Sequence, residues 1–348
     1  EELKDAKETM GYTEDVDLKT LEIAFEANCN FGCSYCNASF STTWQKDIKT
    51  KGPYQNLVSD GAAAFQHDGS HAMPYGRKNK DNPYIEAFWK WWEAELQFSL
   101  RELRVTGGEP SMSPDFWKLM EWWKENPECK VPFAVNSNLG QKKQLLDALI
   151  ESSHSFKDFS IYTSNEAVGL QSEYIRFGLE WDVWLRNMYR INEEANMKSV
   201  NVMMTINSLC LFSITEFMDE MLKLKKKFGH QAAVMSFNIL RFPSFQSIVT
   251  LPTDIRMERA AHMEAWLERN WNDGKNGFMD YERDGLLRLI DYIKKVDTGH
   301  EFTSSLESRE RDFKSFYTQY DLRRKKDFIA AFPMLRQWYE SIPETNLT

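Results

Sequence analysis

The segment from Leu21 to Cys36 reads LEIAFEANCNFGCSYC and joins an apolar, β-forming run directly to three closely spaced cysteines. The run at 21–26 has the length of a buried strand, and the cysteines follow it within a short loop. The chain has 348 residues and five cysteines, and only three of the five cluster. This odd, uneven distribution does not suit a secreted disulfide framework. It indicates a metal site in a reducing compartment.

Five further apolar, β-rich runs alternate with helical patterns, at 102–106, 131–136, 158–163, 199–206 and 233–240. The clearest helix start is Ser113-Pro114-Asp115, where a cap, a first-turn proline and an acidic first turn coincide. Further helices are expected at about 83–99, 141–152, 180–195, 212–228, 253–271, 279–296 and 322–341. The fold class that follows is α/β, a partial (β/α)6 TIM-like barrel with a helical C-terminal extension.

Two parts are expected, a barrel at 1–240 and a helical extension at 241–348. A long polar insertion at 41–82 exceeds an ordinary βα loop of roughly 2–6 residues, so we interpret it as a substrate lid. In parallel α/β folds the loops after the strands build the active site. The chemistry is therefore expected just after residues 26, 106, 136, 163, 206 and 240.

The charge balance restricts the partners. Lys plus Arg is 43 and Asp plus Glu is 52, a formal net charge of −9 that opposes general attraction to nucleic acid or an anionic membrane. No run of about 18 apolar residues occurs. The first residues are acidic, unlike a secretory signal or transit peptide. We expect a soluble, cytoplasmic protein with neither a membrane nor a nucleic acid as partner.

The spacing of Cys29, Cys33 and Cys36 is CxxxCxxC. Three soft ligands on one short loop can hold three irons of a [4Fe-4S] cluster and leave the fourth iron open. A structural zinc site needs a fourth ligand, and the nearest histidines, His67 and His71, lie in the insertion. An iron–sulfur or zinc module without catalysis remains the alternative.

This loop, with Tyr35 just before its last cysteine, resembles the hallmark of the radical S-adenosylmethionine (SAM) superfamily. After the second strand, Thr106-Gly107-Gly108-Glu109-Pro110 resembles the GGE motif of that family. The resemblance implies that the glycines Gly107 and Gly108 let backbone approach SAM and that Glu109 accepts from the SAM amino group. Tyr35 would lie in the same cofactor site.

Other SAM-binding positions follow from the same resemblance. Asn136 and Thr205 each end a strand. Ser160 lies where the family has a ribose-binding serine, and Arg176 lies where it has an arginine that binds the SAM carboxylate. The acidic residue that the family places after the serine is replaced here by Tyr162. For Arg176, a solvated surface side chain is the alternative.

The chain resembles the SPASM/twitch-like branch, but no cysteine follows Cys210 to hold an auxiliary cluster, and Cys129 and Cys210 are expected to be structural. The implied activity is reductive cleavage of SAM to a 5′-deoxyadenosyl radical that abstracts hydrogen, with flavodoxin or ferredoxin as reductant. The substrate is a peptide, an amino sugar or another small polar molecule, with peptide or protein modification preferred. The residue pattern does not decide between an oxidoreductase, a lyase and a transferase. Candidate substrate contacts are Asn238, Arg241 and Trp44, the last with core packing as its alternative.

Overall fold

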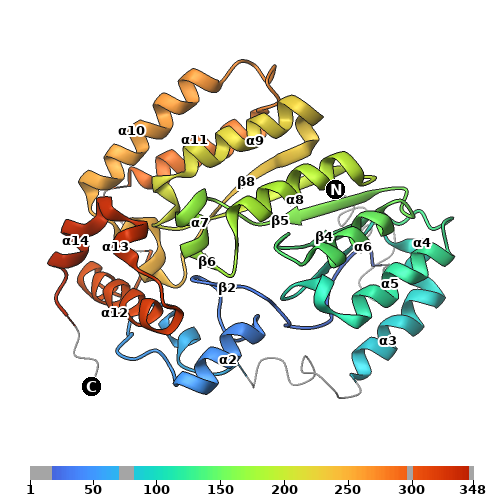
Figure 1. The fold of residues 1–348 in the computed structure, drawn as a ribbon, viewed down its shortest axis with the longest axis horizontal. Coiled ribbons are helices and arrows are strands. Elements are labelled where there is room, and N and C mark those ends of the chain that lie inside the picture. Colours follow the sequence, from blue (N-terminus) through green and yellow to red (C-terminus); the bar gives the residue numbers. More distant parts are fainter. Residues whose placement is uncertain (1–17, 70–81, 296–300, 345–348) are drawn as a thin grey trace, which may run out of the picture.

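The computed structural model describes residues 18–69, 82–295 and 301–344, and its centre is a sheet of six parallel strands (Figure 1). Each strand pairs with the next strand of the sheet in chain order. The strands are β1 (Thr20–Ala24), β3 (Glu102–Thr106), β4 (Phe133–Asn136), β5 (Phe159–Thr163), β7 (Ser199–Ile206) and β8 (Val234–Ile239). Within the described residues the edge strands β1 and β8 do not pair. The fold is therefore a partial (β/α)6 barrel, as predicted.

Helices flank this sheet (Figure 1). Those of the barrel are α2 (Thr42–Lys51), α3 (Pro83–Trp91), a π-helical turn (Trp92–Leu96), α4 (Gln97–Ser99), α5 (Pro114–Glu125), α6 (Lys143–Ser153), α7 (Gly169–Ile175), α8 (Trp181–Glu194) and α9 (Ile214–Phe228). Of these, α5, α6, α8 and α9 each bury one apolar face. The C-terminal helices are α10 (Thr253–Asn270), α11 (Asp280–Ile293), α12 (Leu306–Arg324), α13 (Phe328–Ala331) and α14 (Arg336–Ser341). Short 3-10 turns occur at Ala62–Phe65, Pro110–Met112, Cys210–Phe212, His230–Ala233, Ser244–Gln246, Ile248–Thr250 and Pro333–Leu335. No described helix is both long and apolar enough to cross a membrane.

The two faces of the sheet differ in polarity. In β7, Val200, Val202, Met204 and Ile206 are buried under the helices, and the alternate residues are half-exposed. The strand register places polar side chains of neighbouring strands on that same inner face: Glu22, Arg104, Thr106, Asn136, Ser160, Tyr162, Asn201, Thr205 and Asn238. A polar, accessible inner face suits a bound ligand better than a packed core does.

The predicted strands all overlap observed ones, and one helix prediction is wrong. The helix expected at 322–341 is instead the end of α12 followed by two shorter helices. Lys325 adopts a φ of 54°, a left-handed conformation that ends α12. Asp327 then caps α13 by accepting from the backbone N–H of Ala330.

The segment predicted as an insertion is described in part, and its role as a lid stays a prediction. Residues 41–69 contribute to the hydrophobic core, because the side chains of Trp44, Tyr54 and Phe65 are buried against Phe316 of α12. The remaining part of the proposed lid, 70–81, lies outside the described residues. The boundary between 1–240 and 241–348 stays a prediction, since one hydrophobic cluster runs through both parts.

Asp312 of α12 carries much of the contact with this segment. One of its carboxylate oxygens accepts from the backbone N–H groups of Val58 and Ser59, at 2.8 and 2.7 Å, and from the Ser59 hydroxyl at 2.6 Å. Burial raises the pKa of this carboxyl. The helix thus satisfies backbone donors that the irregular segment leaves unpaired.

Asp312→Ala is expected to lower the free energy of unfolding by about 2–4 kcal/mol, because it leaves these donors without an acceptor. Urea unfolding followed by circular dichroism measures the change. Glu307→Ala is the matched control, since Glu307 pairs with Arg311 on the exposed side of the same helix, and its effect should stay within about 0.5 kcal/mol. Equal effects of the two variants would contradict the role given to Asp312.

Candidate functional site

The three clustered cysteines lie on the loop between β1 and α2, at the carboxyl end of the first strand. Neighbouring elements satisfy the backbone of this loop. The indole of Trp44 donates to the Cys33 carbonyl at 3.0 Å, and the hydroxyls of Thr43 and Tyr320 donate to the carbonyls of Cys29 and Gly32. Within the loop, β2 (Gly32–Cys33) pairs with β6 (Arg176–Phe177) in an antiparallel bridge.

N–H donors are directed at two of the sulfurs. The Phe31 backbone and the Asn138 amide donate to Cys29 Sγ at 3.4 and 4.0 Å, and Arg176 Nη1 donates to Cys33 Sγ at 3.7 Å. Burial raises the pKa of Cys29 to about 12 and also raises the pKa values of Cys33 and Cys36. These thiols therefore keep their protons unless a bound cation displaces them.

The donor set fits an iron–sulfur cluster. All three cysteines are free and half-buried. In the described ranges, no three His, Cys, Asp or Glu side chains are arranged around a point to hold one metal ion. A cluster does not need its ligands to meet at one point, because each thiolate binds a different iron.

The structure shows a reason for glycine at the two GGE positions that the sequence did not predict. A Cβ on Gly108 would lie 2.2 Å from the Asn28 carbonyl oxygen, and one on Gly107, whose φ is +128°, would lie 2.5 Å from that of Glu26. Both glycines therefore allow the chain to pass close to its own backbone, and their approach to SAM stays a prediction. The N–H of Glu109 consequently bonds to the Asn28 carbonyl at 2.6 Å.

Glu109 is also placed differently from the prediction. Its side chain is 1% exposed and accepts from the Ser111 N–H and hydroxyl, the Ser137 hydroxyl and the Asn138 N–H. Four protein donors therefore occupy the carboxylate that was expected to receive the SAM amino group. Glu109 instead connects the loops after β3 and β4, and Asn138 extends this connection to Cys29.

Arg176 is buried, so its alternative as a solvated surface residue is wrong, and its role at the SAM carboxylate stays a prediction. Its Nη2 lies 2.6 Å from Glu166 Oε2, and both side chains are less than 5% exposed. The Tyr35 hydroxyl also donates to Glu166, at 3.2 Å, so Tyr35 belongs to the same buried group. Glu166 was missed by the sequence prediction. The signal for it was an acidic residue three positions after β5, at the end of the sheet where the chemistry was expected.

The remaining predicted SAM residues do not all lie at the carboxyl ends of their strands. Asn136 and Thr205 lie at or next to the carboxyl ends of β4 and β7, where the Thr205 N–H donates to Glu166 at 3.4 Å. Ser160 lies three residues, about 10 Å, before the carboxyl end of β5 and accepts from the Ser199 hydroxyl. It lies on the inner face but away from the strand ends, and its contact with the ribose stays a prediction.

The three predicted substrate residues lie in different environments. Trp44 is fully buried among aromatic rings, so its core-packing alternative is correct and its role as a substrate wall is wrong. Asn238 is exposed on the inner face of β8. Arg241 pairs with Glu301 at 3.1 Å and is 61% exposed. The roles of Asn238 and Arg241 in substrate binding stay predictions.

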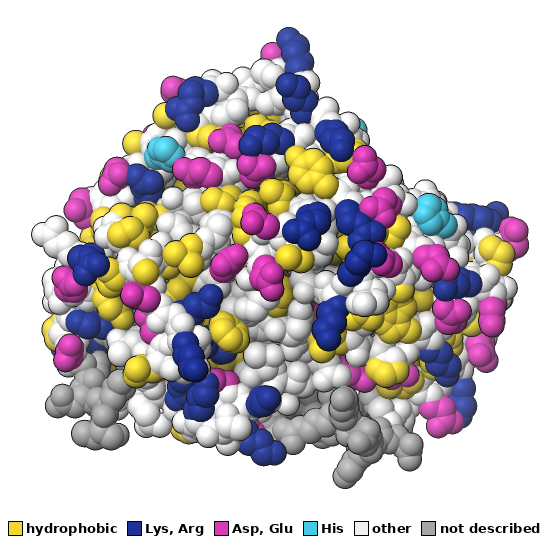
Figure 2. All heavy atoms as spheres, viewed as in Figure 1, with side chains coloured by type: hydrophobic (Ala, Val, Ile, Leu, Met, Phe, Trp, Pro, Cys, Tyr) yellow, Lys and Arg dark blue, Asp and Glu magenta, His cyan; other side chains and the backbone are white. Residues whose placement is uncertain are grey.

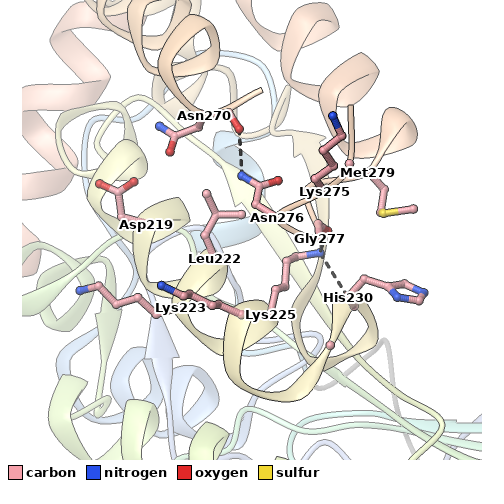
Figure 3. Close-up of a pocket in the computed structure, with 13 residues that line it drawn as sticks. Asp219, Leu222, Lys223, Lys225, His230, Asn270, Lys275, Asn276, Gly277 and Met279 are labelled. Atoms are coloured by element: carbon pink, nitrogen blue, oxygen red, sulfur yellow. Dashed lines mark hydrogen bonds between the residues drawn. The ribbon is translucent and has the colours of Figure 1, made fainter. Parts of the chain in front are cut away.

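A cavity of about 940 Å³ lies elsewhere, between the end of α9 and the segment 270–279 (Figure 3). Lys225 passes beside it to a buried ion pair with Glu282 and to the Gly277 and His230 carbonyls. This cavity is next to the amino end of β8, whereas the cysteines follow the carboxyl end of β1. None of the predicted site residues lines it.

Three solved structures show partial similarity to this chain. SuiB from Streptococcus suis, bound to S-adenosylmethionine, is 15% identical over 74% of this chain, with a TM-score of 0.44. This chain covers 51% of SuiB, about half its length. The structure of anSMEcpe with bound AdoMet and Cp18Cys peptide is 13% identical over 93% of this chain and 99% of its own, with a TM-score of 0.42. TYW1 with a lysine-pyruvate adduct has 14% identity over 72% and 73% of the two chains and a TM-score of 0.34.

No protein-family model and no curated protein matches the sequence.

Gly108→Ala is expected to displace the cysteine loop, because the added methyl would meet backbone that cannot rotate away. The expected result is a loss of more than half of the iron and sulfide bound after anaerobic reconstitution, with little change in helical circular dichroism. Gly169→Ala is the control for backbone strain alone, since its φ of +52° strains an alanine but its methyl would meet no other atom, and it should keep its iron. Full iron loading of Gly108→Ala would contradict this reading.

Proposed function

We propose that this protein is a radical SAM enzyme that binds a [4Fe-4S] cluster through Cys29, Cys33 and Cys36. The observation that carries the proposal is the chemistry of their loop. Three free thiols occur within eight residues, with N–H donors directed at two of the sulfurs. Thiolates with N–H···S bonds suit iron–sulfur clusters, and three of them leave one iron for SAM.

The inner face of the sheet supplies groups for SAM and substrate. Asn136 ends β4 beside the cysteine loop, and its Oδ1 is buried without a partner among the described residues. A buried acceptor without a donor costs free energy. An ammonium or hydroxyl group of a bound ligand would remove that cost. Asn238, and Thr205 beside Glu166, extend this polar surface across β7 and β8.

When bound, the cluster and SAM supply reductive cleavage of SAM to methionine and a 5′-deoxyadenosyl radical that takes a hydrogen atom from substrate. The chain holds the cluster, orients SAM and substrate on the inner face, and limits access of water. The electron comes from a reductant such as flavodoxin or ferredoxin. Whether the net outcome is that of an oxidoreductase, a lyase or a transferase depends on the substrate.

Peptide or protein modification is the substrate class we propose first, and its support is the resemblance to the branch named above. A small metabolite or an amino sugar is the alternative. The polar inner face accommodates either class, because hydroxyl, amide and charged side chains alternate along it.

A function of another class, an iron–sulfur or zinc module that binds without catalysis, makes a different prediction. Such a module has no open iron and no affinity for SAM. Metal analysis with SAM titration by isothermal calorimetry separates the two. The polar inner face and the unpaired Asn136 acceptor favour the enzyme.

The wild-type protein, reconstituted anaerobically with iron and sulfide and then given dithionite and SAM, is expected to form 5′-deoxyadenosine, measured by liquid chromatography. Cys33→Ala should abolish this product and most of the cluster absorbance. Cys129→Ala is the control, because Cys129 lies on a loop after α5.

A folded wild-type protein that carries a full cluster yet forms no 5′-deoxyadenosine would exclude the proposed activity. A Cys129→Ala variant that loses the cluster would show that the ligands are assigned wrongly.

A further inference from the structure

At the cysteine loop, Cys33 lies next to a buried ion pair whose role the proposed function does not assign. The pair is Arg176 and Glu166, and the Tyr35 hydroxyl donates to Glu166. The Arg176 and Glu166 side chains are 4% and 1% exposed, and their closest atoms are 2.6 Å apart. Arg176 Nη1 lies 3.7 Å from Cys33 Sγ, and the Tyr35 ring lies 5.4 Å from the guanidinium carbon.

The three cysteine sulfurs differ in the hydrogen-bond donors that reach them. Cys29 receives N–H donors from two neutral groups, the Phe31 backbone and the Asn138 amide. Cys33 receives its donor from a cation that stays charged at any accessible pH. In the described chain no donor reaches Cys36 Sγ, which itself contacts the Asn37 carbonyl. One ligand of the proposed cluster is thus next to a buried positive charge.

The Arg176 guanidinium beside Cys33 is held in place by a hydrogen bond on the side that faces away from the sulfur. Arg176 Nη2 bonds to Glu166, and Glu166 also accepts from the Tyr35 hydroxyl and the Thr205 N–H. Thr205 belongs to β7, Glu166 follows β5, and Arg176 begins β6. Glu166 is therefore held next to the six-stranded sheet, and Arg176 is held opposite Cys33 by the β2–β6 bridge, so both pairings place the guanidinium beside the sulfur.

We propose that Arg176 and Glu166 together set the reduction potential of the cluster bound at Cys33, with Arg176 acting through that sulfur as a positioning residue. This inference rests on the proposed function, since it requires the cluster. The step concerned is the one-electron reduction of the cluster core from the 2+ to the 1+ state. In a titration titanium(III) supplies the electron and becomes titanium(IV), and no proton is transferred.

The sign of each contribution follows from charge. Reduction adds a negative charge, which a nearby cation and an N–H···S bond stabilise. A nearby carboxylate opposes it. Because both side chains are almost completely buried, solvent screens neither effect strongly. Arg176 should therefore raise the potential and Glu166 should lower it, so that the pair holds it at an intermediate value.

The test is a titration with titanium(III) citrate on reconstituted protein without SAM, followed by electron paramagnetic resonance. Arg176→Gln is expected to lower the ratio of reduced to oxidised cluster at a fixed potential by about tenfold or more. Glu166→Gln, which keeps an acceptor for Arg176 and Tyr35, should raise that ratio. Arg176→Lys keeps the charge and should recover part of the loss.

Arg324→Gln is the matched control. Arg324 is 7% exposed and stacks on Trp44 and Tyr320 against the same loop, but no described contact joins it to a cysteine sulfur. Its removal should change the ratio less than about twofold. Iron and sulfide content and circular dichroism are measured for every variant, so that loss of the cluster is not mistaken for a shift in its potential.

Opposite shifts for Arg176→Gln and Glu166→Gln support the inference, because general damage to the site would not produce opposite signs. Unchanged potentials, shifts of the same sign, or an equal effect of Arg324→Gln would overturn it. Failure of the wild-type protein to assemble a cluster would instead overturn the proposed function.

Discussion

An irregular loop that buries its backbone must find a partner for each polar group outside itself, and the rest of this structure depends on that constraint. The cysteine loop meets it with residues that lie far apart in the sequence. The Ser34 N–H donates to the Ile175 carbonyl, Trp44 donates to Cys33, and Tyr320 donates to Gly32. A loop supported in this way presents its sulfurs in a fixed arrangement before any ligand arrives.

The same constraint explains why the C-terminal helices belong to the working structure. α12 contacts both regions: its Tyr320 donates to Gly32 of the cysteine loop, and its Asp312 accepts from Ser59 in the segment 52–69. Its buried surface mixes aromatic rings with charged residues such as Arg309 and Arg324. That mixture removes the clean apolar period by which a helix is recognised in a sequence, and this is why no helix was predicted at 306–321.

The sequence predicted the strands well because their apolar runs are short and bounded, and it located the cysteine site because the thiol spacing is chemically specific. It did not predict what Glu109, Arg176 and Trp44 contact, since those contacts depend on residues brought together only by folding. Glu166 had no motif of its own. Two of the buried carboxylates have different partners: neutral donors surround Glu109, whereas Glu166 pairs with a cation. Elsewhere the charges are mixed over the surface in view (Figure 2).

The bond between Tyr320 and Gly32 spans 288 residues. During synthesis the three cysteines leave the ribosome early, and the helix that supports their loop follows only near the end of the described chain. Until then the thiols belong to a loop that lacks one of its supports. The loop is thus fully supported only after translation has delivered α12, and the proposed cluster would find its complete site only then.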